Sequence, residues 1–435
     1  MSKKHSFVWK ILLGFVLGTA IGLVLSECVA PETTKKILPY VAPFGNVLVA
    51  MLKMVVYPII LFSLIVGAAA LPLKQSGKVG GMVLGWYFAT SLFATVFGVA
   101  MAYLMNPTME AAKQVASGNL AGAQAMAGNS ANASVGAFIV GLFQNPFAAL
   151  ANGQFLPIIV FSIAFGLCAR YLLDSHGEDE ELCSAVKLVI RLCDGAQRIS
   201  FRIIDCVILY FPIGVFALSV VNFAENGTLL FGPYCRIVVC VVVGVLSMIL
   251  VVYPLAIALF CRENPYRLIL RIRQPIITAF VTRSSAATMP VSFTAMDSVG
   301  VSRSLSSFSI PMGATVNMDG VCVHLPVFVI LAANMFGHPL SVAQIATLCL
   351  SIMFASVGAG GIPGGSVFLL FMVLESMGLA PDQVSLIVAL ALGINPILDM
   401  FETCCNVTGD NVCTYIVAKK NGMVSSKGLV REARR

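Results

Sequence analysis

The feature that most constrains this sequence is a series of apolar segments that recurs from one end of the chain to the other. Each segment is long enough to cross a lipid bilayer, which takes about 20 residues of helix. Of the 435 residues, 58% are hydrophobic and only 11% are charged, which is too apolar for a protein whose surface meets water. The sequence therefore predicts an all-α membrane protein, with residues 1–435 forming a single polytopic domain.

The first part of the chain, 9–262, contains apolar runs that we interpret as six membrane spans. They lie at about 9–26, 43–70, 79–105, 135–173, 183–222 and 232–262. No small-residue cleavage site ends the first run, so we expect a retained span and not a signal peptide. The net charge of +7 is concentrated in SKKH, CRENPYRLILRIRQ, AKK and the basic tail 422–435. Because basic segments stay on the cytoplasmic side, we expect both termini there, and we expect no nucleic-acid binding.

From about residue 265 the pattern changes, because small and polar residues interrupt the apolar runs. FVTRSSAATMPVSF (280–293) and FASVGAGGIPGGSVFLL (354–370) each contain residues that break a helix. Backbone that leaves helical form inside a bilayer must be buried in protein or line a cavity. A long apolar run follows each segment, at 306–336 and at 384–418, so the part 263–421 reads hairpin, span, hairpin, span. We expect an inverted repeat that forms the binding site of a transporter.

Polar side chains gather on one face of the last span, in and around ILDMFETCCNVTGDN (397–411). On a helix that advances about 100° per residue, six of them fall within an arc of about 100°. These are Asn395, Asp399, Glu402, Thr403, Asn406 and Asp410. Carboxylates inside a membrane are costly, so their shared face predicts a functional site. The alternative, a helix end in water, fits Asp410 best because AKK follows it.

A second polar cluster, GATVNMDG (313–320), interrupts the preceding span. An alkali cation takes about five or six hard oxygen ligands. An unwound segment that exposes carbonyl groups beside Asn317 and Asp319 can supply them. The pairing of this cluster with NVTGD (406–410) in the neighbouring span favours a cation site between the two.

The order of TRSSAATMP, GATVNMDG, ASVGAGGIPGG and ILDM...TCCNVTGD closely resembles the dicarboxylate/amino-acid:cation symporter family, over essentially the whole chain. The resemblance implies eight transmembrane helices plus two re-entrant helical hairpins, arranged as inverted repeats. It implies a homotrimer whose transport part moves like an elevator. It also implies a multi-pass protein of the bacterial inner membrane, with lipid around it, that carries an amino acid together with up to three sodium ions (Na+).

Carried over position by position, the resemblance implies two kinds of site. The substrate site would consist of Arg283, Ser284, Ser285, Val321, Ile362, Asp399, Glu402, Thr403 and Asn406. Within it, Asp399 would hold the α-amino group, and Asn406 and Ser285 would hold the α-carboxylate. The sodium ligands would be Gly313, Asn317, Asn406 and Asp410 at one site, Thr315, Ser356, Val357 and Ala359 at a second, and Tyr87, Thr90, Ser91, Asn317 and Asp319 at a third.

Two positions depart from the glutamate-transporting members. Those members carry an arginine three residues after the amino-binding aspartate and a threonine directly after NMDG, where this chain has Glu402 and Val321. A carboxylate that faces a substrate carboxylate is strongly repelled in a low-dielectric pocket, so we do not expect glutamate or aspartate as substrates. A glutamate here resembles the bacterial serine/threonine:sodium symporter branch. That branch lacks the aspartate of NMDG, so the match is partial.

Glu402 can be satisfied in three ways: it is protonated, it accepts a hydrogen bond from a hydroxyl-bearing side chain, or it meets a cationic one. We therefore expect sodium-coupled symport of serine or threonine, with a cationic amino acid or histidine as the alternative. A channel for bare ions would have no use for the zwitterion-sized set Asp399, Ser285 and Asn406. An enzyme is not expected, because no histidine lies within the first hairpin to activate a serine. We interpret His324 and the 13 cysteines as packing residues.

Overall fold

The structure is a computed structural model that describes residues 2–69, 77–105, 140–152, 154–176, 178–336, 340–357, 365–377 and 379–425. Its helices are α1 (Ser2–Glu27), α2 (Pro31–Ala69), α3 (Gly77–Met105), α7 (Pro146–Ala151), α8 (Phe155–Ser175), α9 (Glu180–Asn226), η1 (Gly227–Leu230), α10 (Phe231–Ser247), η2 (Met248–Val252), α11 (Tyr253–Cys261), α12 (Pro265–Arg271), α13 (Arg273–Thr282), α14 (Ser285–Ser298), α15 (Arg303–Val316), α16 (Asp319–Met335), α17 (Val342–Ser356), α18 (Gly365–Ser376) and α19 (Pro381–Lys420). In these parts of the chain the extended pairing is one isolated bridge, Val301 to Val424. The prediction of an all-α protein is confirmed.

In the described part of the chain, eight stretches of helix are long and apolar enough to cross a membrane, as the sequence predicts. They are Trp9–Glu27, Pro31–Ala69, Lys78–Met105, Pro157–Ser175, Glu180–Asn226, Tyr234–Cys261, Arg303–Met335 and Leu386–Lys420. The second helix begins well before the predicted run, at Pro31, because a helix can continue into polar sequence beyond its apolar part. The fourth predicted run is divided, since α7 ends at Ala151 and α8 begins at Phe155. The chain is therefore a multi-pass membrane protein.

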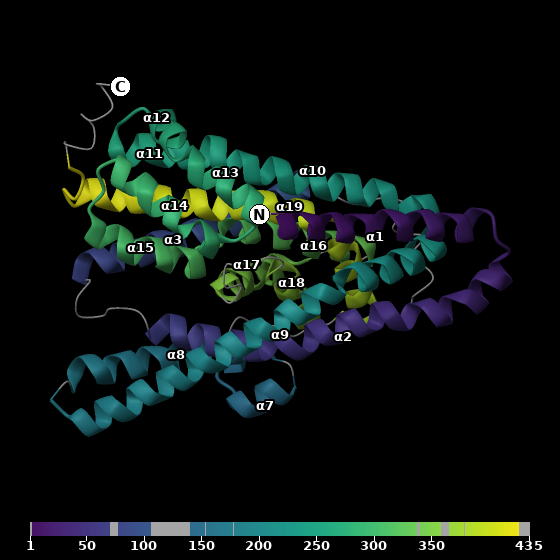
Figure 1. The fold of residues 1–435 in the computed structure, drawn as a ribbon, viewed down its shortest axis with the longest axis horizontal. Helices are drawn as coiled ribbons and strands as arrows, with labels where there is room; N and C mark the ends of the chain where they lie inside the picture. The colour runs from purple at the N-terminus through teal and green to yellow at the C-terminus, as the bar shows by residue number, and fades with distance from the viewer. Residues whose placement is uncertain are drawn as a thin grey trace.

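Helices α1, α2, α8 and α9 pack mainly against one another, with α2 and α1 lying along the long helix α9. Figure 1 shows α2, α8 and α9 as a tilted layer below the rest of the molecule. In α1, Gly14, Gly18 and Gly22 recur at one-turn spacing and face α9. A Cβ on them would lie 2.6, 2.4 and 2.7 Å from the nearest atom of α9. Small residues at this spacing let two membrane helices approach closely.

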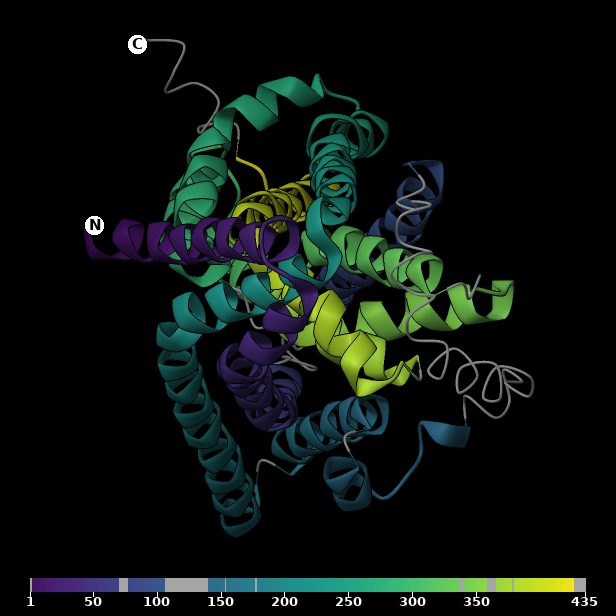
Figure 2. The ribbon, with the colours of Figure 1, turned by 90° about the vertical axis from the view of Figure 1, so that its right-hand side faces the viewer.

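The most enclosed helices are α16 and α19. Every residue from Asp319 to Ala333 of α16 is buried. In the last apolar span, on α19, 76% of the most apolar stretch is buried, against 28% for the first span, on α1. Seen end on in Figure 2, the yellow helix α19 lies among helices from both halves of the chain. Polar groups on α16 and α19 are therefore shielded by protein on several sides.

The two interrupted segments correspond to pairs of short helices. In the first, α13 ends at Thr282, Arg283 takes a left-handed conformation with φ 53°, and α14 begins at Ser285. The hydroxyl of Ser284 accepts a hydrogen bond from the amide of Ala287 (3.3 Å) and caps α14. The second pair is α17 and α18, and residues 358–364 between them lie outside the described residues. Both pairs pack helix on helix, while membrane re-entry, the inverted repeat and the domain division stay predictions.

The sixth span contains a feature that the sequence analysis missed. Between α10 and α11, the segment η2 is a single wide turn of π-helix. Pro254 follows it and has no N–H to donate to the carbonyl of Leu250 four residues earlier. The hydroxyl of Tyr266 donates to that carbonyl instead, at 3.1 Å. The wide turn precedes Tyr253, a buried tyrosine at the start of α11.

Candidate functional site

The first part of the site is Asp319, the first residue of α16. Its side chain is fully buried, and both of its oxygens accept hydrogen bonds. Ser91 of α3 donates to Oδ1 at 3.0 Å, and the hydroxyl of Tyr253 donates to Oδ2 at 2.8 Å. Three helices that are distant in the sequence thus converge on one carboxylate.

Asp410 of α19 is the second buried carboxylate, and α15 ends beside it. The side-chain amide of Asn317 donates to Asp410 Oδ1 at 3.0 Å, and the hydroxyl of Thr90 donates to Asn317 Oδ1 at 3.2 Å. Gly313 lies directly against the carboxylate, because a Cβ there would be 2.4 Å from Oδ1. The same Cβ position is 2.8 Å from the hydroxyl of Tyr87. The structure therefore brings together residues predicted for the first and third sodium sites.

Charge compensation is what these two carboxylates lack. In the described part of the chain, no lysine, arginine or histidine forms an ion pair with Asp319 or Asp410, although both are at most 3% exposed. A buried carboxylate without a cation is strongly unfavourable. Carboxylate, amide and hydroxyl oxygens are the ligands that hard cations prefer. This donor set fits sodium bound as transported cargo.

The second predicted sodium set is not assembled by any contact among the described residues. Thr315 is exposed, and its hydroxyl donates to the carbonyl of Met312 at 3.0 Å. The hydroxyl of buried Ser356 donates to the carbonyl of Met353 at 2.8 Å, and Val357 follows it at the end of α17. Ala359 lies outside the described residues. This set stays a prediction.

A cavity opens next to the carboxylate cluster, on the face of α19 that the helical arc predicts. Its lining residues are Arg283, Ser285, Met318, Val321, Gly365, Ser366, Asp399, Glu402, Thr403 and Asn406. Most of the predicted substrate residues are therefore together. Ser284 does not line the cavity and acts as a helix cap, and Ile362 lies outside the described residues.

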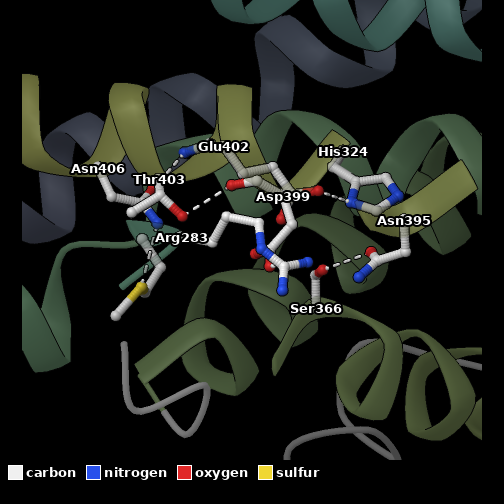
Figure 3. A network of polar contacts seen from close by, with 10 residues as sticks. Arg283, His324, Ser366, Asn395, Asp399, Glu402, Thr403 and Asn406 are labelled. Carbon is white, nitrogen blue, oxygen red and sulfur yellow. Dashed lines mark hydrogen bonds and ion pairs between the residues drawn. The ribbon is translucent and has the colours of Figure 1, made fainter. Parts of the chain in front are cut away.

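Polar groups in the cavity are arranged to meet opposite charges. The guanidinium Nη1 of Arg283 lies 3.7 Å from Asp399 Oδ2, and Figure 3 shows the Arg283 side chain extended toward α19. The Asn406 side chain accepts a hydrogen bond from the amide of Gly320 at 2.7 Å. The buried hydroxyl of Ser285 has no hydrogen-bond partner among the described residues. A carboxylate, a guanidinium and an available hydroxyl suit a zwitterion.

Glu402 has a partner that the sequence analysis did not foresee. Its Oε1 contacts Nδ1 of His324 on α16, and the two side chains are 1% and 0% exposed. In Figure 3 the imidazole points toward Glu402. The interpretation of His324 as a packing residue stays a prediction, and the contact adds a carboxylate to the residues that it packs against. The close approach of α16 to α19 depends on Gly320, one turn before His324. A Cβ on Gly320 would lie 2.4 Å from the carbonyl oxygen of Glu402.

Two further residues were missed. Ser366 of α18 lines the cavity, and its hydroxyl donates to Asn395 Oδ1 on α19 at 3.1 Å. Tyr253 binds Asp319 but appears in the sequence as one tyrosine in an apolar span. Its position before a proline was the available signal, since a proline inside a span marks a local break of the helix.

The comparisons with known proteins agree with this geometry. Residues 7–420 match the model of the sodium:dicarboxylate symporter family. The chain belongs to this family.

It is 28% identical to the proton/glutamate-aspartate symporter of Escherichia coli, over 96% of this chain and 93% of that protein. It is 30% identical to the human neutral amino acid transporter B(0), over 92% of this chain and 77% of that protein. A serine/threonine transporter of Acinetobacter baylyi is also 30% identical, over 93% of this chain and 95% of its own length. This member of the sodium:dicarboxylate symporter family is accordingly a transporter and not an enzyme.

Proposed function

We propose that this protein couples the movement of sodium to the uptake of a small neutral amino acid with a hydroxyl group, serine or threonine. The observation that carries the proposal is the composition of the cavity. It combines Asp399 and Ser285, which suit a zwitterion, with Glu402. By the family resemblance, Glu402 stands where members that carry acidic substrates have an arginine. The serine/threonine transporter among the relatives supports the substrate class.

Sodium coupling is supported by the pair of buried carboxylates. Asp319 and Asp410 lie on neighbouring helices, at the end of the cavity where Asn406 lies. Neither carboxylate has a cationic partner among the described side chains. A cation that binds there makes the site electrically favourable, and crossing the membrane with the site empty would leave the carboxylates uncompensated. We infer that sodium and substrate move together for this reason. We assign the first and third predicted sodium sets to this cluster.

Exclusion of acidic substrates follows from Glu402 and Val321. Neither side chain can bind a second carboxylate, since one is acidic and the other apolar. A hydroxyl group can donate a hydrogen bond to Glu402, which the side chain of alanine cannot. Serine and threonine therefore gain a contact that alanine lacks. A cationic amino acid remains the alternative that the experiment must exclude.

Uptake of labelled L-serine into proteoliposomes under an inward sodium gradient tests the proposal directly. We expect saturable uptake that disappears when choline replaces sodium. Unlabelled serine and threonine should compete strongly, alanine and cysteine less, and lysine, arginine, histidine and aspartate weakly. Uptake that does not depend on sodium, or lysine competing better than serine, would contradict the proposed function.

The arrangement in the membrane is part of the same proposal. We infer a homotrimer in the bacterial inner membrane with both termini cytoplasmic, in which the part around α16 and α19 moves relative to the layer of α2, α8 and α9. The separate packing of that layer supports the division. Exposed apolar side chains on its surface, such as Leu192, Ile199 and Leu209 of α9, suit lipid or another subunit. Cross-linking of variants that carry one introduced cysteine in each of the two parts, in a background without the 13 native cysteines, would measure the movement when compared with and without sodium.

A further inference from the structure

The contact between His324 and Glu402 has a role that the family match does not assign. Both side chains are completely enclosed, and His324 does not line the cavity. Glu402 does line it, so the imidazole reaches the carboxylate from the protein side. The ring of Phe328 packs edge-on against the imidazole with 4.8 Å between ring centres, which fixes its position. His324 can therefore affect a substrate only through Glu402.

The physical consequence concerns net charge. A buried carboxylate or a buried imidazolium is very unfavourable alone, but the two compensate each other when they share one proton. A carboxylate beside an imidazolium and a carboxylic acid beside an imidazole have the same total charge, which is zero. Enclosure thus favours a neutral pair, whichever atom holds the proton.

The other charged side chains of the cavity also cancel. Arg283 and Asp399 carry opposite charges and lie 3.7 Å apart. The remaining lining residues are uncharged: Ser285, Met318, Val321, Gly365, Ser366, Thr403 and Asn406. The lining as described is therefore neutral in total, and it suits a zwitterion without a charge on its side chain.

We propose that His324 is a positioning residue that sets the charge selectivity of the substrate site, because it neutralises Glu402 from behind and so excludes cationic side chains. This inference rests on the proposed function and narrows it, since it decides between the neutral and the cationic substrate classes. Without the imidazole, Glu402 would face the cavity as a carboxylate with no cationic partner among the described residues. A cationic side chain would then replace the missing charge.

The test compares two amino acids of nearly the same shape. L-Homoserine and L-2,4-diaminobutyrate differ in whether the side chain ends in a hydroxyl or an ammonium group. Electrical recording from sensors coated with proteoliposomes gives the half-saturating concentration of each amino acid without a label. The variants are His324→Gln, Glu402→Gln and the double variant, all measured beside the wild type.

We expect the wild type to prefer homoserine. His324→Gln should shift the ratio of the two affinities toward diaminobutyrate by about tenfold or more, the size expected for a buried charge without its partner. The double variant has no charge in either position. Its ratio of the two affinities should therefore return to within about threefold of the wild-type ratio. The half-saturating sodium concentration of His324→Gln, measured by thermal stabilisation without an amino acid, should stay at the wild-type value. If His324 only packed, its replacement would lower the affinity for both amino acids equally.

The possible results separate the inference from the proposed function. An unchanged ratio in His324→Gln overturns the inference, even if serine uptake confirms the proposed function. A wild type that carries alanine in preference to serine overturns the proposed function and leaves the inference standing. A wild type that prefers diaminobutyrate overturns both. If His324→Gln does not fold, His324→Phe retains the ring beside Phe328 and the same shift is expected from it, while the wild-type ratio alone still tests the inference.

Discussion

Replacement of Gly313 by alanine tests the sodium cluster without changing any charge. The added Cβ would lie 2.4 Å from Asp410 Oδ1, whereas two atoms in ordinary contact stay about 3.5 Å apart, so the carboxylate must move by about 1 Å. Asp410 is held by the side-chain amide of Asn317 at 3.0 Å, and a shift of that size takes the pair beyond hydrogen-bonding distance. The variant therefore distorts the cluster itself.

The expected magnitude follows from the hydrogen bond that is lost. A buried hydrogen bond to a charged group contributes about 1.5–3 kcal/mol, and each 1.4 kcal/mol is about a tenfold change in affinity. We expect the half-saturating sodium concentration to rise by roughly 10- to 100-fold. Alanine favours a helix over glycine by about 1 kcal/mol, so the helix itself is not weakened.

Sodium-dependent thermal stabilisation of the purified protein is a suitable assay, because a bound ligand raises the melting temperature as its concentration increases. The matched control is Gly85→Ala in α3, where an added Cβ meets nothing within 4 Å. The control should have the same sodium midpoint as the wild type. A sodium midpoint within about twofold of wild type in Gly313→Ala would refute the reasoning, because the predicted change is at least tenfold.

Four other variants test neighbouring parts of the site. Asp319→Asn removes one carboxylate at constant shape and should raise the sodium requirement by about tenfold or more, and an unchanged requirement would count against the sodium assignment. Tyr253→Phe deletes the hydrogen bond to that carboxylate, worth about 1.5–3 kcal/mol because the acceptor is charged, together with a longer contact to the carbonyl of Cys405 (3.3 Å), so a rise of about tenfold or more is expected in the same titration. Asp399→Asn should lower the affinity for serine by about 100-fold and leave sodium stabilisation intact, whereas equal loss of both would indicate misfolding. The double variant Glu402→Arg with Val321→Thr should gain sodium-dependent aspartate uptake and lose serine uptake, and failure to take up aspartate would argue that these positions do not face the substrate side chain.

The face of α19 could be predicted because helical periodicity alone determines which of its side chains point the same way. Asp399, Glu402, Thr403 and Asn406 all line the cavity, as the arc of polar residues implies. The positions of the spans were also predictable, since membrane thickness fixes how much apolar sequence each helix needs. The ends of the spans were harder to predict, since α2 begins at Pro31, well before its apolar run.

Contacts between helices were harder to predict, because they depend on packing that no local pattern records. His324 has the spacing of one helical turn from Gly320, so both lie on the side of α16 that faces α19. That spacing was visible, but the partner Glu402 was not. Tyr253 presented the same difficulty, since its bond to Asp319 depends on how the sixth span packs on the seventh.

The wide turn η2 separates two properties of the sixth span that an unbroken helix would couple. Crossing the membrane depends on the length of the span, whereas the direction of Tyr253 depends on rotation about the helix axis. A π-helical turn holds one residue more than an α-helical turn, which rotates everything after it by about 100°. A substitution in 248–252 that closes η2 into an α-helical turn, with no residue removed, would leave the span long enough but turn the hydroxyl of Tyr253 away from Asp319. A change in 248–252 that keeps its length can therefore alter cation binding, even where all the polar residues are retained.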